Sequence, residues 1–296
     1  MAISEAQLET WSHQGSVIQS ASTYETIKNA LQDNNSPYAS KKFDVFLQGS
    51  YGNDTNIYAD SDVDVVIRLS SVYYSDLTKL NEEEKSLYKK HRTDGTDTFS
   101  AFKAEVLSWL TAKFGSGVNA GSKAIFLPDN GNRRKVDVLV CVKHRSYYKY
   151  SGPADARYHD GVCFWTDKGK KIVNYPKQHM SNSTTKHQGC NQRFKPTVRT
   201  LKNIRNGAIE AGYLREGVAP SYYLDGLLYN VPPDLFVNSC EQTFINYIKW
   251  LDQCNRNELL CANKRHYLLR DNSPVCWNER DYLTFREGIV KFWNDA

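Results

Sequence analysis

Three aspartates occupy positions where the sequence predicts strands, and they are the residues best suited to carry a reaction. Asp62 and Asp64 lie in the alternating run of residues 62–69, so their side chains project from one face, roughly 7 Å apart. Asp137 lies in a second apolar run, residues 135–142. A carboxylate inside an apolar strand is costly unless it is paired or binds a metal ion. Oxygen ligands suit Mg²⁺ or Mn²⁺, so these residues predict a site for two divalent ions.

A second motif precedes the aspartates. Gln48, Gly49 and Ser50 follow a short predicted strand, and eleven residues separate Ser50 from Asp62. Glycine lets backbone N–H groups approach phosphate oxygens closely, and the serine hydroxyl adds a donor. The motif is not a P-loop, and neither HExxH nor GxSxG occurs. No protein nucleophile is required, because a substrate hydroxyl can attack a phosphate directly. Asp60 shares the alternation but falls outside the motif, and we interpret it as a loop residue.

The combined pattern resembles the polymerase-β-like nucleotidyltransferases, whose signature is hydrophobic-Gly-Ser, a spacer, Asp-x-Asp and a distant third Asp. Asp-x-Asp alone would usually be a strand-end turn or a surface pair, whereas the full signature favours catalysis. The resemblance implies that Asp62, Asp64 and Asp137 are catalytic metal ligands. It also implies that the Gln48-Gly49-Ser50 segment binds nucleotide.

A basic row lies in the C-terminal half. Lys195, Arg199 and Lys202 recur at i, i+4 and i+7, opposite an apolar stripe of a predicted helix. A solvated basic face is as plausible as phosphate binding for the first two. Lys202 followed by Ser221 resembles the triphosphate-holding elements of cyclic GMP-AMP synthase and its bacterial relatives. The resemblance implies that both residues bind the donor's β- and γ-phosphates.

The same resemblance concerns the aromatic residues. Tyr222 or Tyr223 would stack on a base, because an aromatic face stacks on bases with roughly 1–3 kcal/mol. Packing in the protein core is an equally plausible role for both tyrosines. Trp165 and Thr166 are the candidate base contacts, facing the cleft.

Over nearly the whole chain, and most specifically at residues 47–69, the sequence resembles a bacterial CD-NTase. This family makes cyclic di- or trinucleotide signals in antiphage defence. The resemblance implies an α+β fold with two lobes around the active site. Residues 1–170 would form a mixed-sheet nucleotidyltransferase core with an N-terminal spine helix, and residues 171–296 a helical lobe. The substrates would be NTPs, with ATP and either GTP or another NTP. A ribose hydroxyl would attack an α-phosphate, twice, with release of pyrophosphate.

The elements that must position these residues follow from hydrophobic periodicity. Helices are expected at residues 16–31, 97–114, 196–211, 222–229, 234–254 and 280–293. Strands are expected at residues 44–47, 62–69, 122–127, 135–142 and 161–165, with a hairpin turn at Asn130-Gly131. The charge-rich stretch of residues 70–96 predicts a solvated helix or lid. We interpret Arg133 and Arg134 as part of a solvated turn.

The amino-acid composition excludes several classes of protein. The 296 residues carry 38 Lys+Arg against 33 Asp+Glu, so the net charge of +5 argues against a nucleic-acid coat protein. A hydrophobic content of 40% excludes wholesale disorder. No run is apolar enough for a membrane span, and seven scattered Cys argue against a disulfide framework. We therefore expect a cytoplasmic protein, and a monomer. The resemblance to the CD-NTases implies defence-system effector or regulatory proteins as partners.

Two further expectations concern activation and alternatives. His179, His187 and Cys190 are the nearest approach to a zinc site, but they supply too few soft ligands, so neither zinc nor a DNA activator is expected. One alternative function is a nucleotidyltransferase that modifies RNA, a protein or a small molecule. Another is an inactive nucleotide-binding scaffold, against which the intact aspartates and Gly49-Ser50 count.

Overall fold

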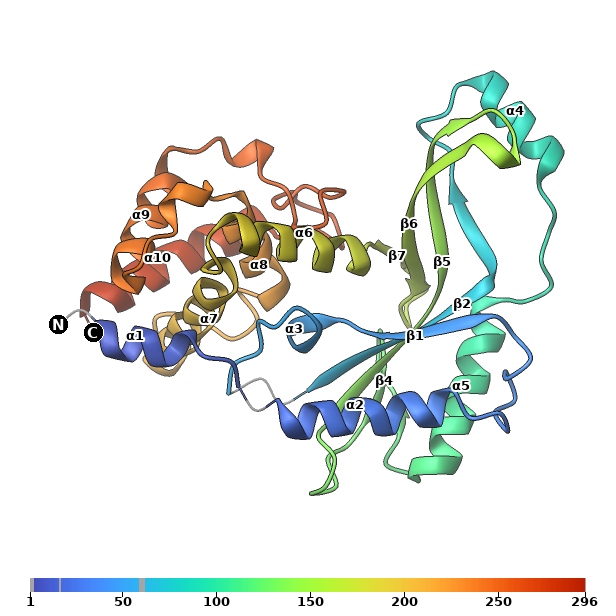
Figure 1. Ribbon diagram of the computed structural model, residues 1–296, viewed down its shortest axis with the longest axis horizontal. Coiled ribbons are helices and arrows are strands. Elements are labelled where there is room, and N and C mark those ends of the chain that lie inside the picture. The colour runs from blue at the N-terminus through green and yellow to red at the C-terminus, as the bar shows by residue number, and fades with distance from the viewer. Residues whose placement is uncertain (1–2, 16, 59–61, 296) are drawn as a thin grey trace. The chain divides into compact units, whose positions relative to one another are not determined.

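The computed structural model describes residues 3–15, 17–58 and 62–295, so Asp60 lies outside the described residues. Its contacts divide the chain into two compact units (Figure 1). The sheet unit comprises Ile18–Gln48 and Asp62–Pro176. The helical unit comprises Met1–Val17, Gly49–Ser61 and Lys177–Ala296. The expected division into residues 1–170 and 171–296 is contiguous, whereas these units interleave along the chain.

The sheet unit is built on one mixed sheet, with strand order β1-β2-β5-β4-β3 and with β6 and β7 added beside β5. In the described residues its strands are β1 Phe43–Leu47, β2 Val63–Asp76, β3 Asn119–Ala120, β4 Ile125–Leu127, β5 Val136–Tyr150, β6 Ala156–Trp165 and β7 Lys171–Asn174. The central pair, β2 and β5, is parallel, and the neighbouring pairs are antiparallel. The predicted hairpin is confirmed, since β4 pairs with β5 on either side of the Asn130-Gly131 turn.

Two helices cover one face of this sheet. These are α2 Ile18–Leu31 and α5 Phe99–Phe114, which begins after the N-cap Thr98. The alternate residues Val63, Val65, Ile67 and Leu69 of β2 share a buried core with both helices. Because side chains alternate along a strand, Asp64 and Arg68 project from the opposite face. The hydrophobic pattern of β2 therefore decides which face carries the carboxylates.

The charge-rich stretch becomes two elements. Strand β2 continues to Asp76, beyond its expected end, and α4 spans Glu82–His91 with Asn81 and Glu84 forming a capping box. The expected helix is confirmed, but it is not solvated all round. Its Tyr88 is buried against Tyr147 and Tyr150 of β5 in a small separate core. Part of the tyrosine content of the chain is therefore used in packing.

The helical unit surrounds a second core. Its helices in the described residues are α1 Glu5–Ser12, α3 Gly49–Gly52, α6 Pro176–Gly189, α7 Phe194–Glu210, α8 Ser221–Asn230, α9 Cys240–Gln253 and α10 Glu279–Asp295. Helix α1, which the sequence did not predict, belongs here because Leu8 is buried in the same core as Phe194 and Trp277. The expected helix of residues 234–254 starts only at Cys240, because Pro233–Leu235 form a separate 3₁₀ turn and Ser239 caps α9. No described helix has the length and apolarity needed to cross a membrane.

Candidate active site

Two of the three aspartates lie side by side on neighbouring strands. In the parallel pairing of β2 with β5, Asp64 is the register partner of Asp137, and the Val63 N–H donates to the Lys135 carbonyl at 3.0 Å. Adjacent strands lie about 4.8 Å apart, so the two carboxylates leave the sheet from neighbouring positions. Asp62 comes one residue before β2 and is exposed. The three aspartates thus lie within the sheet unit, and the strand register brings Asp64 beside Asp137.

The electrostatics of this edge favour a bound cation. Burial raises the pKa of Asp137 above its usual range, and the nearby charge of Asp62 raises it further. Both causes destabilise the ionised carboxylate, and a divalent ion would remove the repulsion. In the described part of the chain, no three His, Cys, Asp or Glu side chains are already arranged to hold a metal ion. The carboxylate oxygens of these aspartates suit Mg²⁺ or Mn²⁺.

The Gly-Ser motif begins where β1 ends. Leu47 of β1 pairs with Val65, and the Gln48 N–H donates to the carbonyl of Asp64 at 3.1 Å. Gly49 follows with a φ of 68°, a left-handed conformation in which glycine has no steric penalty. The β1–β2 pairing therefore fixes the position of the Gln48 backbone beside Asp64 of β2.

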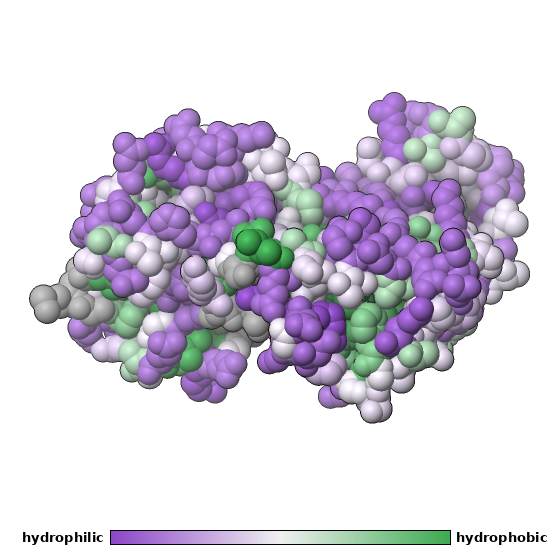
Figure 2. Space-filling model, turned by 60° about the horizontal axis from the view of Figure 1, so that its bottom comes forward, coloured by the Kyte–Doolittle hydropathy of each residue, from purple (hydrophilic) through white to green (hydrophobic). Residues whose placement is uncertain are grey.

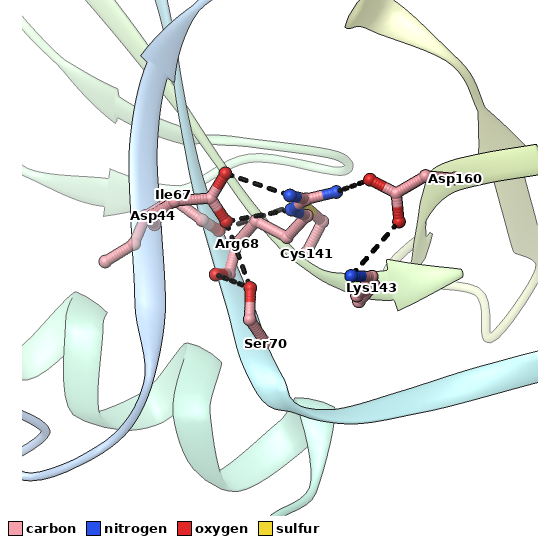
Figure 3. Close-up of polar contacts among 7 residues, drawn as sticks. All are labelled: Asp44, Ile67, Arg68, Ser70, Cys141, Lys143 and Asp160. Carbon is pink, nitrogen blue, oxygen red and sulfur yellow. Dashed lines mark hydrogen bonds and ion pairs between the residues drawn. The ribbon is translucent and has the colours of Figure 1, made fainter. Parts of the chain in front are cut away.

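A buried ionic network lies further along the face that carries the carboxylates (Figure 3). The Arg68 guanidinium donates to both oxygens of Asp44 on β1, at 2.8 and 3.0 Å, and to Asp160 on β6 at 2.7 Å. Lys143 of β5 lies 3.5 Å from the other Asp160 oxygen, and Ser70 donates to Asp44 at 3.1 Å. These contacts tie β1, β2, β5 and β6 together. This network was not predicted from the sequence. Arg68, four residues after Asp64 in an apolar strand, could have indicated it, because a buried arginine needs carboxylate partners.

The basic row of α7 is not a solvated face, and that alternative is wrong. Lys195 is 8% exposed and Lys202 is fully buried. Lys195 binds the Asp54 carboxylate at 2.7 Å, and Lys202 donates to the Thr55 carbonyl at 2.8 Å. Arg199 donates to the Asp54 carbonyl, and burial lowers its pKa to about 10, so it stays protonated at neutral pH. In this structure the row binds a loop of its own unit.

The other expected nucleotide contacts in the helical unit have protein partners as well. Ser221 begins α8, and its hydroxyl accepts from Arg205 at 3.2 Å. Tyr222 stacks on His179 and accepts a hydrogen bond from Asn263. Tyr223 stacks on Trp277 and donates to the Cys276 carbonyl. Packing thus already orients both tyrosine rings, and their role as base contacts stays a prediction.

Trp165 does not lie with the carboxylates. Its ring packs against Phe99 of α5 and Tyr74, and it borders the core on the helix-covered face of the sheet. Trp165 has the same alternation as Cys163, which pairs with Val142 of that core. The structure therefore does not support Trp165 as a base contact. Thr166 lies just beyond β6, where its N–H donates to the Lys170 carbonyl in a turn.

The remaining basic and soft side chains also have local partners. Arg133 is 6% exposed and donates to the carbonyl of Pro128, so the expected solvated turn is wrong for this residue. Arg134 donates to Gln19 of α2. His187 accepts from the Lys195 N–H at 3.3 Å, and Cys190 is buried in the core of the helical unit.

Comparisons with known proteins agree with this architecture. The cGAS/DncV-like nucleotidyltransferase C-terminal helical domain matches residues 181–294. A cyclic nucleotide synthase, CdnE01, from Staphylococcus haemolyticus is 34% identical over all of both chains. The chain belongs to the bacterial cGAS/DncV-like nucleotidyltransferases, the CD-NTases. It is therefore an enzyme of the nucleotidyltransferase class, and the expected α+β fold is confirmed.

Other CD-NTases match over their full length. A cyclic UMP-AMP synthase from Rhodothermus marinus is 36% identical over 99% of both chains. The structure of the R. marinus CdnE with Apcpp and Upnpp has a TM-score of 0.88 at 34% identity, covering 99% of this chain and 97% of that one. The Elizabethkingia meningoseptica CdnE, solved with GTP and Apcpp, has a TM-score of 0.78 at 27% identity, covering 98% of both. Cyclic nucleotide synthesis is thus the activity for which these relatives are named.

Proposed function

We propose that this CD-NTase condenses nucleoside triphosphates into a cyclic di- or trinucleotide. The observation that carries the proposal is the register of β2 with β5, which places Asp64 beside Asp137, with Asp62 one residue before β2. Carboxylates brought together in this way need a compensating cation, and a triphosphate substrate arrives with one.

The three aspartates have distinct parts in this scheme. Asp62, Asp64 and Asp137 would hold two divalent ions, which supply charge neutralisation at the α-phosphate and the leaving pyrophosphate. Asp137 is the residue proposed to help deprotonate the ribose hydroxyl, because it lies beside Asp64 in the register of β2 and β5 and the ion that it would hold supplies a Lewis acid to that hydroxyl. The same residues would serve again when the linear intermediate turns over and its second hydroxyl attacks.

Several residues would bind the nucleotides. The backbone at Gly49 and the hydroxyl of Ser50 are proposed phosphate donors, with Gln48 adjoining them. Lys202 and Ser221 are proposed donor-phosphate contacts, and each would have to exchange a present partner, Thr55 or Arg205. Tyr222 is the proposed base-stacking residue, since its ring is already oriented by His179.

The nucleobases are the least constrained part of the proposal. The relatives' names include a cyclic UMP-AMP synthase, a dipurine synthase and a dipyrimidine synthase at 36%, 32% and 32% identity. Overall similarity at this level does not set base choice. We propose ATP as one substrate, with GTP or another NTP as the second. On the family resemblance, we propose that the product acts in antiphage signalling of the CBASS type in the cytoplasm, with effector proteins as partners.

The test is product formation from labelled substrates. The purified chain is incubated with all four α-labelled NTPs and Mg²⁺ or Mn²⁺, then treated with phosphatase, and the products are separated. A phosphatase-resistant species is expected from the wild type and none from the Asp62→Asn/Asp64→Asn double variant. Asp94→Asn is the matched control, because Asp94 is an exposed aspartate of the same unit whose carboxylate pairs with the nearby Arg92. Label appearing only on added RNA or protein would refute cyclisation.

A further inference from the structure

The basic row of α7 and the loop that follows Ser50 form a connected set within the helical unit. We call Lys195, Arg199 and Lys202 the α7 row, and residues 53–57 the return loop. The two are far apart in sequence, and the residues in contact are between 141 and 147 positions apart. The loop itself is described up to residue 58.

Each member of the row binds a different group at the start of the loop. Lys195 binds the Asp54 carboxylate at 2.7 Å, Arg199 donates to the Asp54 carbonyl at 2.5 Å, and Lys202 donates to the Thr55 carbonyl at 2.8 Å. Arg199 also donates to the Ser12 carbonyl at the end of α1. Two successive carbonyls and one carboxylate are therefore held by cations from three turns of one helix.

The loop transmits this anchoring to the Gly-Ser motif through its own backbone. The Thr55 N–H donates to the Ser50 carbonyl at 2.9 Å, and the Asn53 N–H donates to the Gly49 carbonyl at 3.2 Å. Between them Asp54 has a φ of 56°, in the left-handed region that few non-glycine residues adopt and in which Asp and Asn are enriched. Lys195 and Arg199 are the groups that hold Asp54.

The loop is also fixed from its other side. Gln14 donates to the Asn56 side chain at 2.7 Å, and the Gly15 N–H donates to the Asn56 carbonyl at 3.1 Å. Thr55 and Asn56 are 1% and 4% exposed. The return loop is thus held by buried residues and by hydrogen bonds on both of its sides.

We propose that the Lys195–Asp54 pair is a positioning device for phosphate binding, which sets the conformation of Gly49 and Ser50 through the return loop. This inference rests on the proposed function, in which those two residues bind the substrate phosphates. Lys195 touches no substrate in this scheme. Its effect is on the geometry of the donors, and a small displacement of such donors can cost much more in binding than in fold stability.

The type of contact favours positioning over stability. Lys195 has its stem buried in the helical unit, while its ammonium group reaches a carboxylate whose side chain is 59% exposed. Such a half-exposed ion pair contributes little net stability, so the conformation that it specifies is the better explanation for it. Removing the pair takes one contact away from Asp54 and leaves the core residues of α7 in place.

The experiment compares three variants of the pair with a matched lysine elsewhere. Lys195→Met removes the charge, Lys195→Arg keeps it, and Asp54→Asn removes the carboxylate while keeping a residue that tolerates positive φ. The control is Lys186→Met, because Lys186 of α6 is another partly buried lysine of this unit whose ammonium group binds a protein oxygen, the Val231 carbonyl. Dissociation constants for a non-hydrolysable ATP analogue with Mg²⁺, KM for ATP, kcat and the thermal midpoint are measured for each.

For Lys195→Met and Asp54→Asn, we expect KM and the dissociation constant to rise about tenfold, with kcat changed by less than about threefold. Lys195→Arg should restore most of the affinity. The Lys195→Met/Asp54→Asn double variant should be no worse than the poorer single variant, because both remove one interaction. Lys186→Met should lower the thermal midpoint without changing KM.

The opposite results are equally clear. If Lys195→Met and Asp54→Asn lower the thermal midpoint as Lys186→Met does but leave KM and analogue affinity unchanged, the positioning role is wrong. If Lys195→Met fails to fold, Asp54→Asn decides the question, since the Asp54 side chain is largely exposed. A wild-type chain that binds no ATP analogue and forms no product would overturn the proposed function itself, whatever the variants do.

Discussion

Replacing Arg68 by methionine tests how the carboxylate face of the sheet is held together. Arg68 is 7% exposed and makes three charge-assisted hydrogen bonds, two to Asp44 and one to Asp160. Methionine retains much of the apolar stem but none of the donors. Two carboxylates on different strands then face each other without the cation between them.

The size of the effect follows from the contacts. Removing one partner of a buried ion pair typically costs about 3–5 kcal/mol, because the partner is left uncompensated. Asp44 and Asp160 keep 33% and 34% of their side-chain surface, so water can take up part of the loss. We therefore expect the lower end, about 3 kcal/mol in the free energy of unfolding. At about 2.1 cal/mol/K of unfolding entropy per residue, a chain of 296 residues should lose roughly 5 °C in the thermal midpoint.

Urea denaturation of wild type, Arg68→Met and two comparison variants measures this loss. Lys113→Met removes a pair with Asp33 that water screens more strongly, and it should cost much less than Arg68→Met. Adding Asp44→Asn and Asp160→Asn to Arg68→Met should recover part of the stability, because the uncompensated charges disappear. An Arg68→Met variant as stable as Lys113→Met would refute the network as the link between β1, β2 and β6.

Three further changes probe the site and its surroundings. Asp137→Asn should reduce product formation by at least about 10³-fold, yet raise the free energy of unfolding of the metal-free protein at neutral pH. The sign follows from the raised pKa of Asp137: the wild type should lose stability as pH rises from the ordinary carboxyl range through that raised pKa, the variant should not, and pH-dependent urea denaturation would reveal equal slopes if this is wrong. Trp165→Ala should cost about 2–3 kcal/mol by urea denaturation and leave the product's base composition unchanged by mass spectrometry; a changed composition at unchanged stability would restore it as a base contact. Gly15→Ala should displace the return loop and raise KM for ATP, because its new Cβ would lie 2.5 Å from the Ile57 carbonyl oxygen, and an unchanged KM would count against the loop's role.

The sequence predicted the carboxylate site because strand alternation is a local rule. The alternating pattern placed Asp62 and Asp64 on one face of an expected strand, and Asp137 in a second expected strand. Their register across β2 and β5 depends on a parallel pairing between distant segments, which no local pattern specifies. The structure adds that register.

The basic row shows the limit of the same reasoning. Helical spacing correctly aligned Lys195, Arg199 and Lys202, but spacing cannot identify a partner that lies more than 140 residues away in a loop. Trp165 shows a different limit. Its placement came from resemblance, whereas alternation from Cys163 puts it on the helix-covered face. Tertiary contacts decide such positions.

The intact mass of the phosphatase-resistant product, formed from unlabelled NTPs and Mg²⁺, tests most directly whether the chain cyclises nucleotides at its three aspartates. We expect a mass equal to two or three nucleoside monophosphates less one water for each linkage, with as many linkages as nucleotides. We also expect this species to be absent when Asp62→Asn/Asp64→Asn replaces the wild type. A linear product with one linkage fewer, or a cyclic species that persists in the double variant, would refute cyclisation at these carboxylates.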